Sequence, residues 1–465
     1  MLPLVGLRES GGAAEAAAET AEALGVPAAS PRPKHDVKHN VILLLADTLR
    51  ADHTSLYGYA RPTTPALERR ARTATVFERN RSQTACTPTS VASLLTSRYP
   101  AHFLARELGI PPHVRSLAEI LRDAGYRTIG LSASGVVRNT PSKVNRTGGF
   151  GRGFDVFDEE CENRGATCLN ERALAFLGEG KGPFFLYVHY MDVHHPYRPP
   201  DDHERRFALA DVSSEPPWLR DGNPDPIGRL LHGRPEPGDA GARLDQVPYL
   251  RDLYDDEILA FDAELDRFLE ALDERGLLDD SIVILAADHG EMFLEQDEIK
   301  HCRGLWDSVS RTPLVLWVPG VEGGRRITSP AENVDVVPTI VDLLGLPKTA
   351  SAGFEGESLR GHLEGTTPAS APGLAFASQS TLRSVDDGRF KLILEIDSGR
   401  ARLYDLAADP LEREDVSAKQ PAERDRLRKA LDAWLAKNRE VVGHAETIDK
   451  SNRVERKLRA LGYLE

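Results

Sequence analysis

The segment from Val41 to Thr48 reads VILLLADT, and it decides the fold of this chain. Its uninterrupted apolar run is typical of a β-strand that is covered on both faces, as the strands of a parallel sheet are. Similar runs occur at four further places along the chain: residues 128–131 (TIGL), 184–188 (FFLYV), 282–285 (IVIL) and 314–318 (LVLWV). The repeated pattern predicts several buried strands of one sheet.

Helical patterns lie between these runs. In the clearest one, apolar residues step by three and four positions from Ile258 to Leu272, and Gly276 is placed to end the helix. Strands that alternate with helices are typical of an α/β protein in which a mostly parallel sheet lies between helices. We therefore predict an α/β fold.

Changes in composition divide the chain into three parts. Residues 1–37 are rich in Ala and Glu and then in Pro, which predicts a flexible leader. A core is expected over residues 38–365, with an inserted loop at about 200–247 where Gly and Pro are frequent. A smaller C-terminal α+β subdomain with a helical tail is expected over residues 366–465. It should contain a strand at residues 390–394 and a helix at residues 422–438.

The charge balance limits the partners of the protein. The 465 residues carry a net charge of −14, from 58 Lys and Arg against 72 Asp and Glu. Because a nucleic-acid-binding protein needs a basic surface, this balance argues against nucleic acid. An anionic substrate stays compatible with it, since a bound cation reverses the sign of the charge inside a pocket. The oligomeric state is left open.

The chain has no apolar run near the roughly 20 residues that cross a bilayer, so no membrane-spanning segment is expected. Its first residues, MLPLVGLRESGG, lack the basic start and long apolar core of a signal peptide. Localisation is left open: the protein is exported if the true start lies upstream, and otherwise cytoplasmic. Cys161 and Cys168 are close enough for a local disulfide, although buried free thiols are an equal alternative.

Polar residues follow three of the predicted strands. Asp47 follows the first run, Asp288 and His289 follow the run at 282–285, and a histidine-rich segment follows the run before residue 189. Ligands of such sheets bind beyond the carboxyl ends of the strands. Carboxylate oxygen and imidazole nitrogen together suit a divalent cation. The pattern predicts a metal site, although Asp47 alone could instead cap a helix.

A candidate nucleophile lies in residues 83–97, which read QTACTPTSVASLLTS. Cys86 and Thr87 precede Pro88, and the helical pattern that follows predicts a helix N-terminus at this point. The exposed amides and the helix dipole favour an anion there, such as sulfate or phosphate. An ordinary capping segment is the alternative, because Ser and Thr are favoured caps.

Many blocks of this sequence resemble those of sulfatases, which belong to the alkaline-phosphatase-like superfamily. The resemblance covers roughly residues 38–415, with the blocks in the family's order. The blocks are VILLLADTLRADHTS (41–55), YGYARPTTP (57–65), residues 86–100, GYRTIGL (125–131), GFDVFDE (153–159), HYMDVHHPYRPP (189–200), AADHGE (286–291), KH (300–301), RTPLVLWVPG (311–320), VDVVPTIVDLLGLP (334–347) and LYDLAADPLE (403–412).

The resemblance implies an alkaline-phosphatase-like core that holds one divalent metal ion. The ion is calcium in many sulfatases and manganese or zinc in related phosphoesterases, and the nitrogen ligand expected here favours the latter two. Carried over to this chain, the metal ligands are Asp47, Asp288 and His289. The residues that contact the ester's anion or protonate its leaving group are His194 and His301, and further substrate-binding residues are Arg50 and Lys300.

The nucleophile block departs from the sulfatase pattern Cys-x-Pro-x-Arg, in which the Cys is oxidised to formylglycine. Cys86 and Pro88 fit that pattern, but Ser90 stands where Arg is expected. A frame shifted by one residue makes Thr87 the nucleophile, as in related phosphotransferases that use an unmodified Thr. One residue of shift turns a helical side chain by about 100°, so only one of Cys86 and Thr87 can face the metal. The sequence leaves this choice open.

We therefore predict a sulfatase-like enzyme that hydrolyses sulfate esters through a nucleophile at Cys86 or Thr87. Its substrate is expected to be a small anionic ester or a sulfated glycan. One alternative is a phosphodiester or phosphomonoester hydrolase or transferase that uses Thr87. A second alternative is an inactive protein that binds a sulfated glycan. The retained Asp47 and Asp288 argue against that last reading, because a degenerate site has no need of costly buried carboxylates.

Overall fold

The computed structural model of this chain describes residues 39–102, 109–141, 145, 148–162, 165–178, 182–201, 203–209 and 215–438. The predicted leader and the last part of the predicted tail lie outside these residues. Among the helices described, none is long and apolar enough to cross a membrane.

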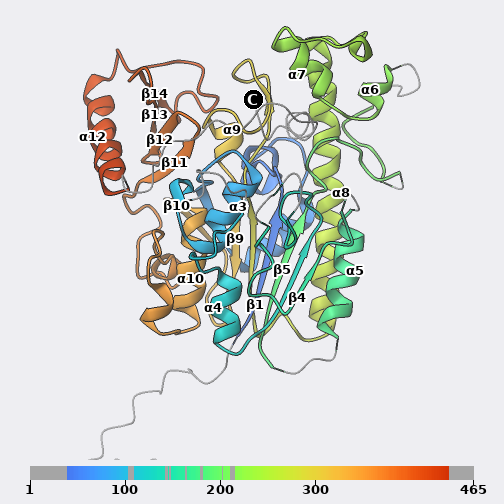
Figure 1. Cartoon of the computed structure of the whole chain (residues 1–465), viewed down its shortest axis with the longest axis vertical. Helices are drawn as coiled ribbons and strands as arrows, with labels where there is room; N and C mark the ends of the chain where they lie inside the picture. The colour runs from blue at the N-terminus through green and yellow to red at the C-terminus, as the bar shows by residue number, and fades with distance from the viewer. Residues whose placement is uncertain are drawn as a thin grey trace, which may run out of the picture. The chain divides into compact units, whose positions relative to one another are not determined.

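The core is built on an eight-stranded sheet with the order β10-β2-β9-β6-β1-β5-β3-β4 (Figure 1). Only β9 runs antiparallel to its neighbours, so the sheet is mostly parallel, as predicted. The strands are β1 (Asn40–Ala46), β2 (Thr75–Arg81), β3 (Arg127–Ser132), β4 (Val156–Asp158), β5 (Phe184–Tyr190), β6 (Ser281–Ala287), β9 (Leu314–Trp317) and β10 (Arg325–Glu332). All five apolar runs of the sequence form strands.

Alternate residues of β1 point to opposite faces of the sheet. Ile42 and Leu44 pack on one face, whereas Leu43 and Leu45 pack on the other, and all four are fully buried. The two faces are covered by different helices, as Figure 1 shows. One set is α5 (Ala166–Leu177) and α8 (Val247–Glu274), and the other is α3 (Thr87–Thr96), α4 (Leu117–Asp123) and α10 (Val336–Leu343).

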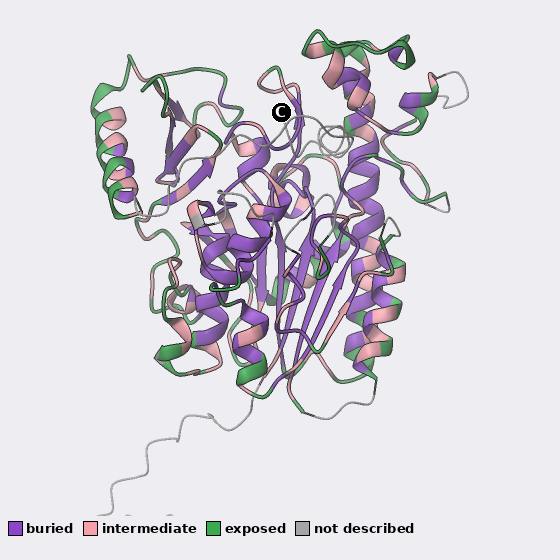
Figure 2. Ribbon diagram, in the orientation of Figure 1, coloured by how far each residue is buried: buried purple, intermediate pink, exposed green. Residues whose placement is uncertain are grey.

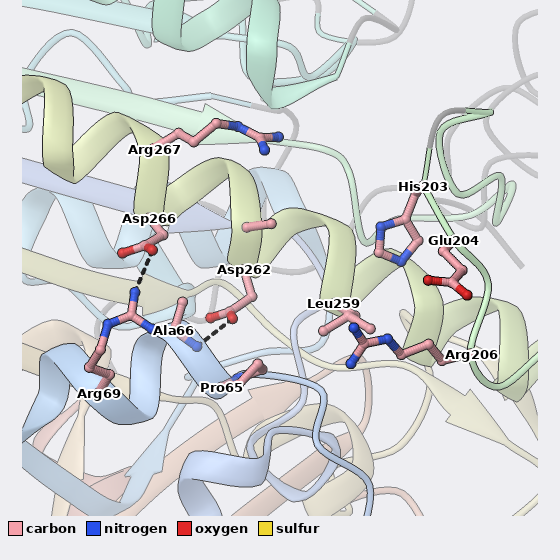
Figure 3. Close-up of a pocket in the computed structure, with 11 residues that line it drawn as sticks. Pro65, Ala66, Arg69, His203, Glu204, Arg206, Leu259, Asp262, Asp266 and Arg267 are labelled. Atoms are coloured by element: carbon pink, nitrogen blue, oxygen red, sulfur yellow. Dashed lines mark hydrogen bonds and ion pairs between the residues drawn. The ribbon is translucent and has the colours of Figure 1, made fainter.

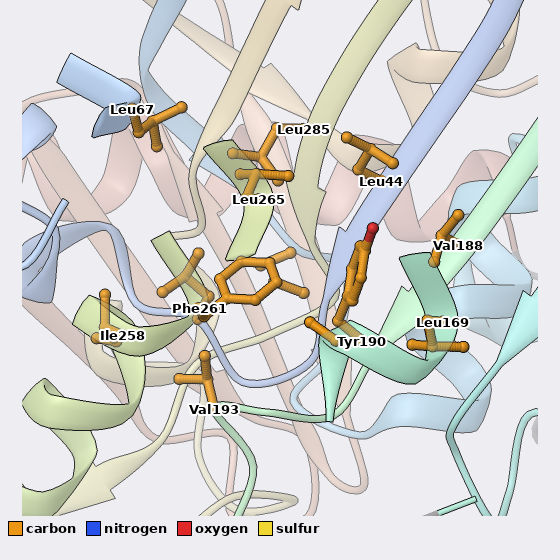
Figure 4. Packing of buried hydrophobic residues seen from close by; sticks show 14 of the residues in the cluster. Leu44, Leu67, Leu169, Val188, Tyr190, Val193, Ile258, Phe261, Leu265 and Leu285 are labelled. Atoms are coloured by element: carbon orange, nitrogen blue, oxygen red, sulfur yellow. The ribbon is translucent and has the colours of Figure 1, made fainter. Parts of the chain in front are cut away.

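The long helix α8 supplies much of the first core. Its Ile258, Phe261 and Leu265 pack with Leu44 and Tyr190 of the sheet (Figure 4). The helix is followed by Gly276, which has a φ of 65° and donates its N–H to the carbonyl of Asp273, so the predicted end of this helix is confirmed. Figure 2 shows that burial is greatest in the strands and falls on the outer faces of α5 and α12 (Pro421–Lys437).

A second, smaller sheet lies towards the C-terminus. Its four antiparallel strands follow the order β11-β12-β13-β14, with α12 packed against them. Their bounds are β11 (Ala375–Gln379), β12 (Leu382–Asp386), β13 (Phe390–Glu395) and β14 (Ala401–Asp405). The strand predicted at 390–394 is therefore β13, and the helix predicted at 422–438 is α12. The predicted α+β character of this part is confirmed.

Short elements complete the described chain. The stretch predicted as an inserted loop contains α6 (Pro217–Arg220) and α7 (Asp225–Leu231). A two-stranded ribbon, β7 (Met292–Phe293) and β8 (Ile299–Lys300), follows β6. The remaining α-helices are α2 (Pro65–Arg70), α9 (Asp307–Ser310) and α11 (Arg360–Leu363).

A pocket of about 430 Å³ lies between α2 and α8 (Figure 3). One wall is fixed by Asp262, whose carboxylate accepts the backbone N–H groups of Ala66 and Leu67. None of the predicted site residues lines this pocket. The candidate active site must therefore be sought at the strand ends.

Candidate active site

The three strand ends that carry polar residues are neighbours in the sheet. Because β1 pairs with both β5 and β6, Ala46 lies level with Tyr190 on one side and with Ala287 on the other. The residues that come next after β1 and β6 are Asp47 and Asp288. Both carboxylates are fully buried. Parallel pairing thus brings together side chains that are far apart in the sequence.

Asp47, Asp288 and His289 offer ligand atoms that lie within 4.8 Å of one another. Two of their oxygens, Asp47 Oδ1 and Asp288 Oδ2, are buried and make no hydrogen bond to the described residues. His289 Nδ1 lies 2.9 Å from the carbonyl oxygen of Gly290, which leaves Nε2 to face the carboxylates. Two buried carboxylates with one oriented imidazole fit a divalent cation.

The pKa values of these three groups reflect their closeness. Burial alone would raise the pKa of Asp47, but the neighbouring histidines lower it below its usual range. Burial, together with the Asp47 carboxylate, raises the pKa of Asp288 to about 6. Burial alone would lower the pKa of His289, whereas the two carboxylates raise it above its usual value. The cluster therefore has an excess of negative charge that a cation would neutralise.

Thr87 is the first residue of α3, and its hydroxyl faces this cluster. Its Oγ1 lies 3.0 Å from His289 Nε2 and 3.4 Å from Asp47 Oδ2. The helix is fixed in this phase by Ser90, whose hydroxyl donates a 2.6 Å hydrogen bond to the carbonyl oxygen of Asp288. The predicted helix N-terminus is thus confirmed, with Thr87 on the side that faces the carboxylates.

Cys86 is the N-cap residue of α3 and points elsewhere. Its sulfur forms a disulfide with Cys302, which follows His301. A second disulfide joins Cys161 and Cys168, one of the two states that the sequence allowed. No signal in the sequence indicated the pairing of Cys86, because its partner lies 216 residues away.

A second cluster of buried histidines adjoins the first. The ring centroid of His301 lies 4.6 Å from that of His289 and 5.0 Å from that of His194, and His195 lies in the same group. Burial lowers the pKa of His194 to about 4, and it lowers those of His195 and His301 well below the usual histidine value. These three rings are therefore neutral near pH 7.

Glu291 orients this second cluster. Its Oε1 lies 3.0 Å from His301 Nδ1, and its Oε2 accepts a 3.0 Å hydrogen bond from the hydroxyl of Tyr197 and lies 3.5 Å from His195 Nδ1. Burial raises the pKa of Glu291 to about 7. A carboxylate behind a histidine fixes its tautomer and its ring orientation.

The two predicted substrate-binding residues lie outside the clusters. The buried guanidinium of Arg50 donates to Asp52 and Glu295 and to the backbone carbonyl of Glu291, so its donors already have partners. Lys300 forms an ion pair with Asp225 of α7, and burial lowers its pKa to about 7. Its charge is nevertheless close enough to lower the pKa values of the neighbouring histidines.

Two further residues reach the site. The imidazole of His189, in β5, lies near Asp47, and its Nε2 is 3.3 Å from Asp47 Oδ2. Its only signal in the sequence is that it follows an apolar run.

Gln379 comes from β11 of the smaller sheet and donates a 3.1 Å hydrogen bond to the carbonyl of Cys302. A glutamine in a remote strand carries no sequence signal of such a role. Asp192, in the same histidine-rich segment, instead accepts the N–H of Ala166 at the start of α5.

Residues 39–346 match the family model described as Sulfatase, and the chain belongs to that family. It is 31% identical over 173 residues to a choline-sulfatase of Rhizobium meliloti, a match that covers 35% of this chain and 32% of the relative. It is 25% identical over 431 residues to an ulvan-active sulfatase of Formosa agariphila, covering 86% and 81%. The chain thus spans about a third of the length of the first relative.

Solved structures share the fold. The phosphonate monoester hydrolase of Agrobacterium radiobacter superposes with a TM-score of 0.68 at 23% identity, covering 86% of this chain and 96% of the other. The alkaline-phosphatase-like fold that the sequence predicted is therefore confirmed. At 23% identity this similarity establishes the fold but not the substrate.

Proposed function

We propose that this chain is a metal-dependent hydrolase of small anionic esters, sulfate esters first among them, with Thr87 as its nucleophile. The observation that supports this best is the position of Thr87 Oγ1, in contact with both His289 and Asp47. Membership of the sulfatase family supports sulfate esters as the substrate class. Sulfated glycans stay within the proposal, since a relative is an ulvan-active sulfatase.

We propose Asp47, Asp288 and His289 as the ligands of one divalent ion. Two of their buried carboxylate oxygens accept no hydrogen bond from the described residues, which supports this assignment, and the mixture of oxygen and nitrogen favours manganese or zinc over calcium. When bound, such an ion supplies positive charge that lowers the pKa of a nearby hydroxyl and polarises the ester.

The residues of the chain would then act as follows. Thr87 Oγ1 attacks sulfur, the ester oxygen leaves as an alcohol, and a sulfothreonine remains. Water cleaves that intermediate, which restores the hydroxyl and releases sulfate. The position of Thr87 at the start of α3 places backbone amides near the anion. We propose that His194 and His301 contact the ester's anion or protonate its leaving group. Arg50 would hold Glu291 in place through the hydrogen bond that its guanidinium donates to the backbone carbonyl of Glu291.

Phosphate or phosphonate monoesters are a second candidate substrate class. The specific observation in their favour is that Thr87, and not the disulfide-bonded Cys86, faces the carboxylates. A threonine hydroxyl without modification is well suited to phosphoryl transfer, because a phosphothreonine is cleaved by water more readily than a sulfothreonine. The fold is also shared with a phosphonate monoester hydrolase.

Three chromogenic esters test these proposals after Mn²⁺ or Zn²⁺ is restored to the protein: 4-nitrophenyl sulfate, 4-nitrophenyl phosphate and a 4-nitrophenyl phosphonate. We expect turnover of the sulfate by the wild type and by Thr87→Ser, and none by Thr87→Ala. Thr89→Ala, two residues further along α3, is the matched control and should keep activity. Turnover of the phosphorus esters alone would replace the first substrate class by the second.

Two outcomes would overturn the assignment of the nucleophile or of the enzyme class. Formylglycine at position 86 in peptide mass spectrometry, together with loss of activity in Cys86→Ala, would transfer the role of nucleophile from Thr87 to Cys86. A protein that binds metal but turns over none of the three esters would point to a protein that binds a sulfated glycan.

A further inference from the structure

One side chain of the smaller sheet bridges two segments of the candidate active site that lie far apart in the sequence. Gln379 is the last residue of β11, and its Oε1 accepts the N–H of Ala85 at 3.3 Å as well as the hydroxyl of Thr84. Its Nε2 donates a 3.1 Å hydrogen bond to the carbonyl of Cys302 and lies 3.6 Å from the sulfur of Cys86. One amide group therefore holds both segments.

The two segments lead directly to groups of the proposed reaction. The first continues into Thr87, the proposed nucleophile, which follows Cys86 in the chain. The second begins at His301, which precedes Cys302. His289 lies between them, since its Nε2 is 3.0 Å from Thr87 Oγ1 and its ring centroid is 4.6 Å from that of His301. A shift of one segment against the other would therefore change how Thr87 and His301 face the ester.

Two other contacts join the same segments. The disulfide links Cys86 to Cys302, and the N–H of Cys302 donates a 2.7 Å hydrogen bond to the carbonyl of Ala85. Both contacts lie within the two segments themselves. The contacts of Gln379 differ because they also tie both segments to the smaller sheet.

The strand that carries Gln379 is itself anchored beside the nucleophile segment. Ser378 donates its backbone N–H to the carbonyl of Gln83 at 2.8 Å, and Gln379 pairs with Leu382 across the hairpin. An amide suits this position because it offers an acceptor and a donor at once. A glutamate carboxylate would only accept, and it would repel the carbonyl of Cys302.

We propose that Gln379 is a positioning residue, which keeps Thr87 and His301 in the relative arrangement that hydrolysis requires. The inference rests on the proposed function for the parts that Thr87 and His301 play. The disulfide of Cys86 restrains the same two segments, so each link compensates for loss of the other. The contribution of Gln379 is therefore largest when the disulfide is absent.

The first test is a double-mutant cycle that combines Gln379→Leu with Cys86→Ser. The values of kcat and KM, per folded molecule, are measured with the 4-nitrophenyl ester that the wild type cleaves fastest. We expect kcat of each single variant to stay within about 3-fold of wild type, and kcat of the double variant to fall about 30-fold with KM within about 3-fold. Such a loss exceeds the product of the two single effects.

Two further variants are matched controls. Gln379→Glu keeps the size of the side chain but removes the donor, so with Cys86→Ser it should lose kcat as Gln379→Leu does. Gln296 Nε2 donates a 2.6 Å hydrogen bond to the carbonyl of Leu411, away from Thr87. Gln296→Leu combined with Cys86→Ser should therefore keep the kcat of Cys86→Ser alone.

The second test needs no substrate. Hydrogen–deuterium exchange is followed by mass spectrometry in peptides that cover residues 84–90 and 299–304. We expect faster exchange of both peptides in Gln379→Leu, and faster still in the double variant, because the hydrogen bonds of Ala85 and Cys302 open more often. The same peptides should exchange at the wild-type rate in Gln296→Leu.

A double variant that keeps the kcat of Cys86→Ser, or that raises KM without lowering kcat, would overturn the proposal. If the double variant does not fold, the exchange of Gln379→Leu decides, and wild-type exchange of both peptides would refute the link. A wild type that cleaves none of the esters contradicts the proposed function, while faster exchange in Gln379→Leu still supports the link. Normal hydrolysis with unchanged exchange and unchanged kcat in the variants does the reverse.

Discussion

Among the described residues, two buried clusters of ionisable side chains differ in what their carboxylates contact: Lys and Arg in one, histidines in the other. The first, here the ionic network, joins the main sheet to the smaller sheet and consists of Arg81, Asp307, Asp386, Lys391 and Glu412. The second, here the site cluster, lies at the carboxyl ends of β1, β5 and β6. It consists of Asp47, His189, His194, His195, Asp288, His289, Glu291 and His301.

In the ionic network each cation contacts two carboxylates. Arg81 pairs with Asp386 and, at 2.9 Å, with Asp307. Lys391 Nζ lies 2.9 Å from Asp307 Oδ1 and 3.0 Å from Glu412 Oε1. Burial alone would raise the pKa of Asp307, but the two cations lower it below its usual range. The network thus contains its own Lys and Arg, and its ion pairs link the main sheet to the smaller one.

In the site cluster the carboxylates contact histidines instead of lysine or arginine. The ion pairs of Asp47 and Asp288 in the described part of the chain are with His189 and His289. His194, His195 and His301, whose pKa values burial lowers, bring no positive charge near pH 7 to offset these acids. Buried carboxylates of this chain therefore occur in two settings: a network with Lys and Arg of its own, and a cluster with histidines for which we propose an added cation.

The largest expected effect is in the site cluster, at Asp288. Asp288→Asn keeps the size of the side chain but removes a charge from a proposed metal ligand. We expect hydrolysis to fall about 1,000-fold or more, equivalent to roughly 4 kcal/mol. The metal-free variant should unfold at the same temperature as the wild type or higher, because an uncompensated buried charge is gone.

The measurements are kcat with metal restored and thermal unfolding after chelation. Asp262→Asn is the matched control, since Asp262 is a buried carboxylate that caps α2 away from the site. It should keep activity and lose stability. If Asp288→Asn turned over substrate at the wild-type rate, Asp288 would not be a ligand of a catalytic metal ion, and the proposed difference between the two clusters would be wrong.

A substitution in the ionic network should lower stability and leave turnover unchanged. Lys391→Met leaves Asp307 and Glu412 without one of their cations, and we expect the free energy of unfolding to fall by about 3–5 kcal/mol. Turnover per folded molecule should not change. Urea unfolding measures the loss. Arg428→Met, which breaks a pair with Asp432 on the surface of α12, should cost at most about 0.5 kcal/mol. Equal losses in both variants would contradict the role assigned to the network.

Opening the disulfide of Cys86 tests whether Cys86 takes part in catalysis or only stabilises the fold. Cys86→Ser opens a link between residues 216 positions apart, and we expect a loss of about 2–4 kcal/mol in unfolding free energy. Hydrolysis should stay within a few-fold of wild type, because Thr87 is the proposed nucleophile. Cys161→Ser opens a link of only 7 positions and should cost less. A stable but inactive Cys86→Ser protein would place Cys86 within the site.

The smallest effect is a dependence on pH. Burial raises the pKa of Glu412 from its ordinary 4.5 to about 7 in the folded protein. The stabilisation from its neutral form is fully present below pH 4.5 and is lost as the pH rises through 7. Between pH 5 and pH 8, wild-type unfolding free energy should fall by about 2–3 kcal/mol relative to Glu412→Gln. If urea unfolding gives the wild type and Glu412→Gln the same dependence of unfolding free energy on pH, Glu412 is already ionised at pH 5 in the folded protein, and the prediction is wrong.

The sequence predicted the central strands well but not the strands β2 and β10. β1, β5 and β6 are apolar on both faces because helices cover both sides of the sheet, and such runs can be recognised directly. β2 reads TVFERNR and β10 reads RRITSPAE, and their polar residues hide the strand pattern. Only the pairing with neighbouring strands makes these segments part of the sheet.

The same division holds for the site. The sequence alone determined that Asp47, Asp288 and His289 stand at strand ends and that a helix begins near Thr87, because both follow from local apolar periodicity and from the direction of parallel strands. The tertiary structure decided which of Cys86 and Thr87 faces the carboxylates, and that His195 joins the histidines around Glu291. Those outcomes depend on the rotation of α3 against β6 and on contacts between residues far apart in the chain. Local sequence does not encode such contacts, because the direction of a side chain is fixed only when the elements pack.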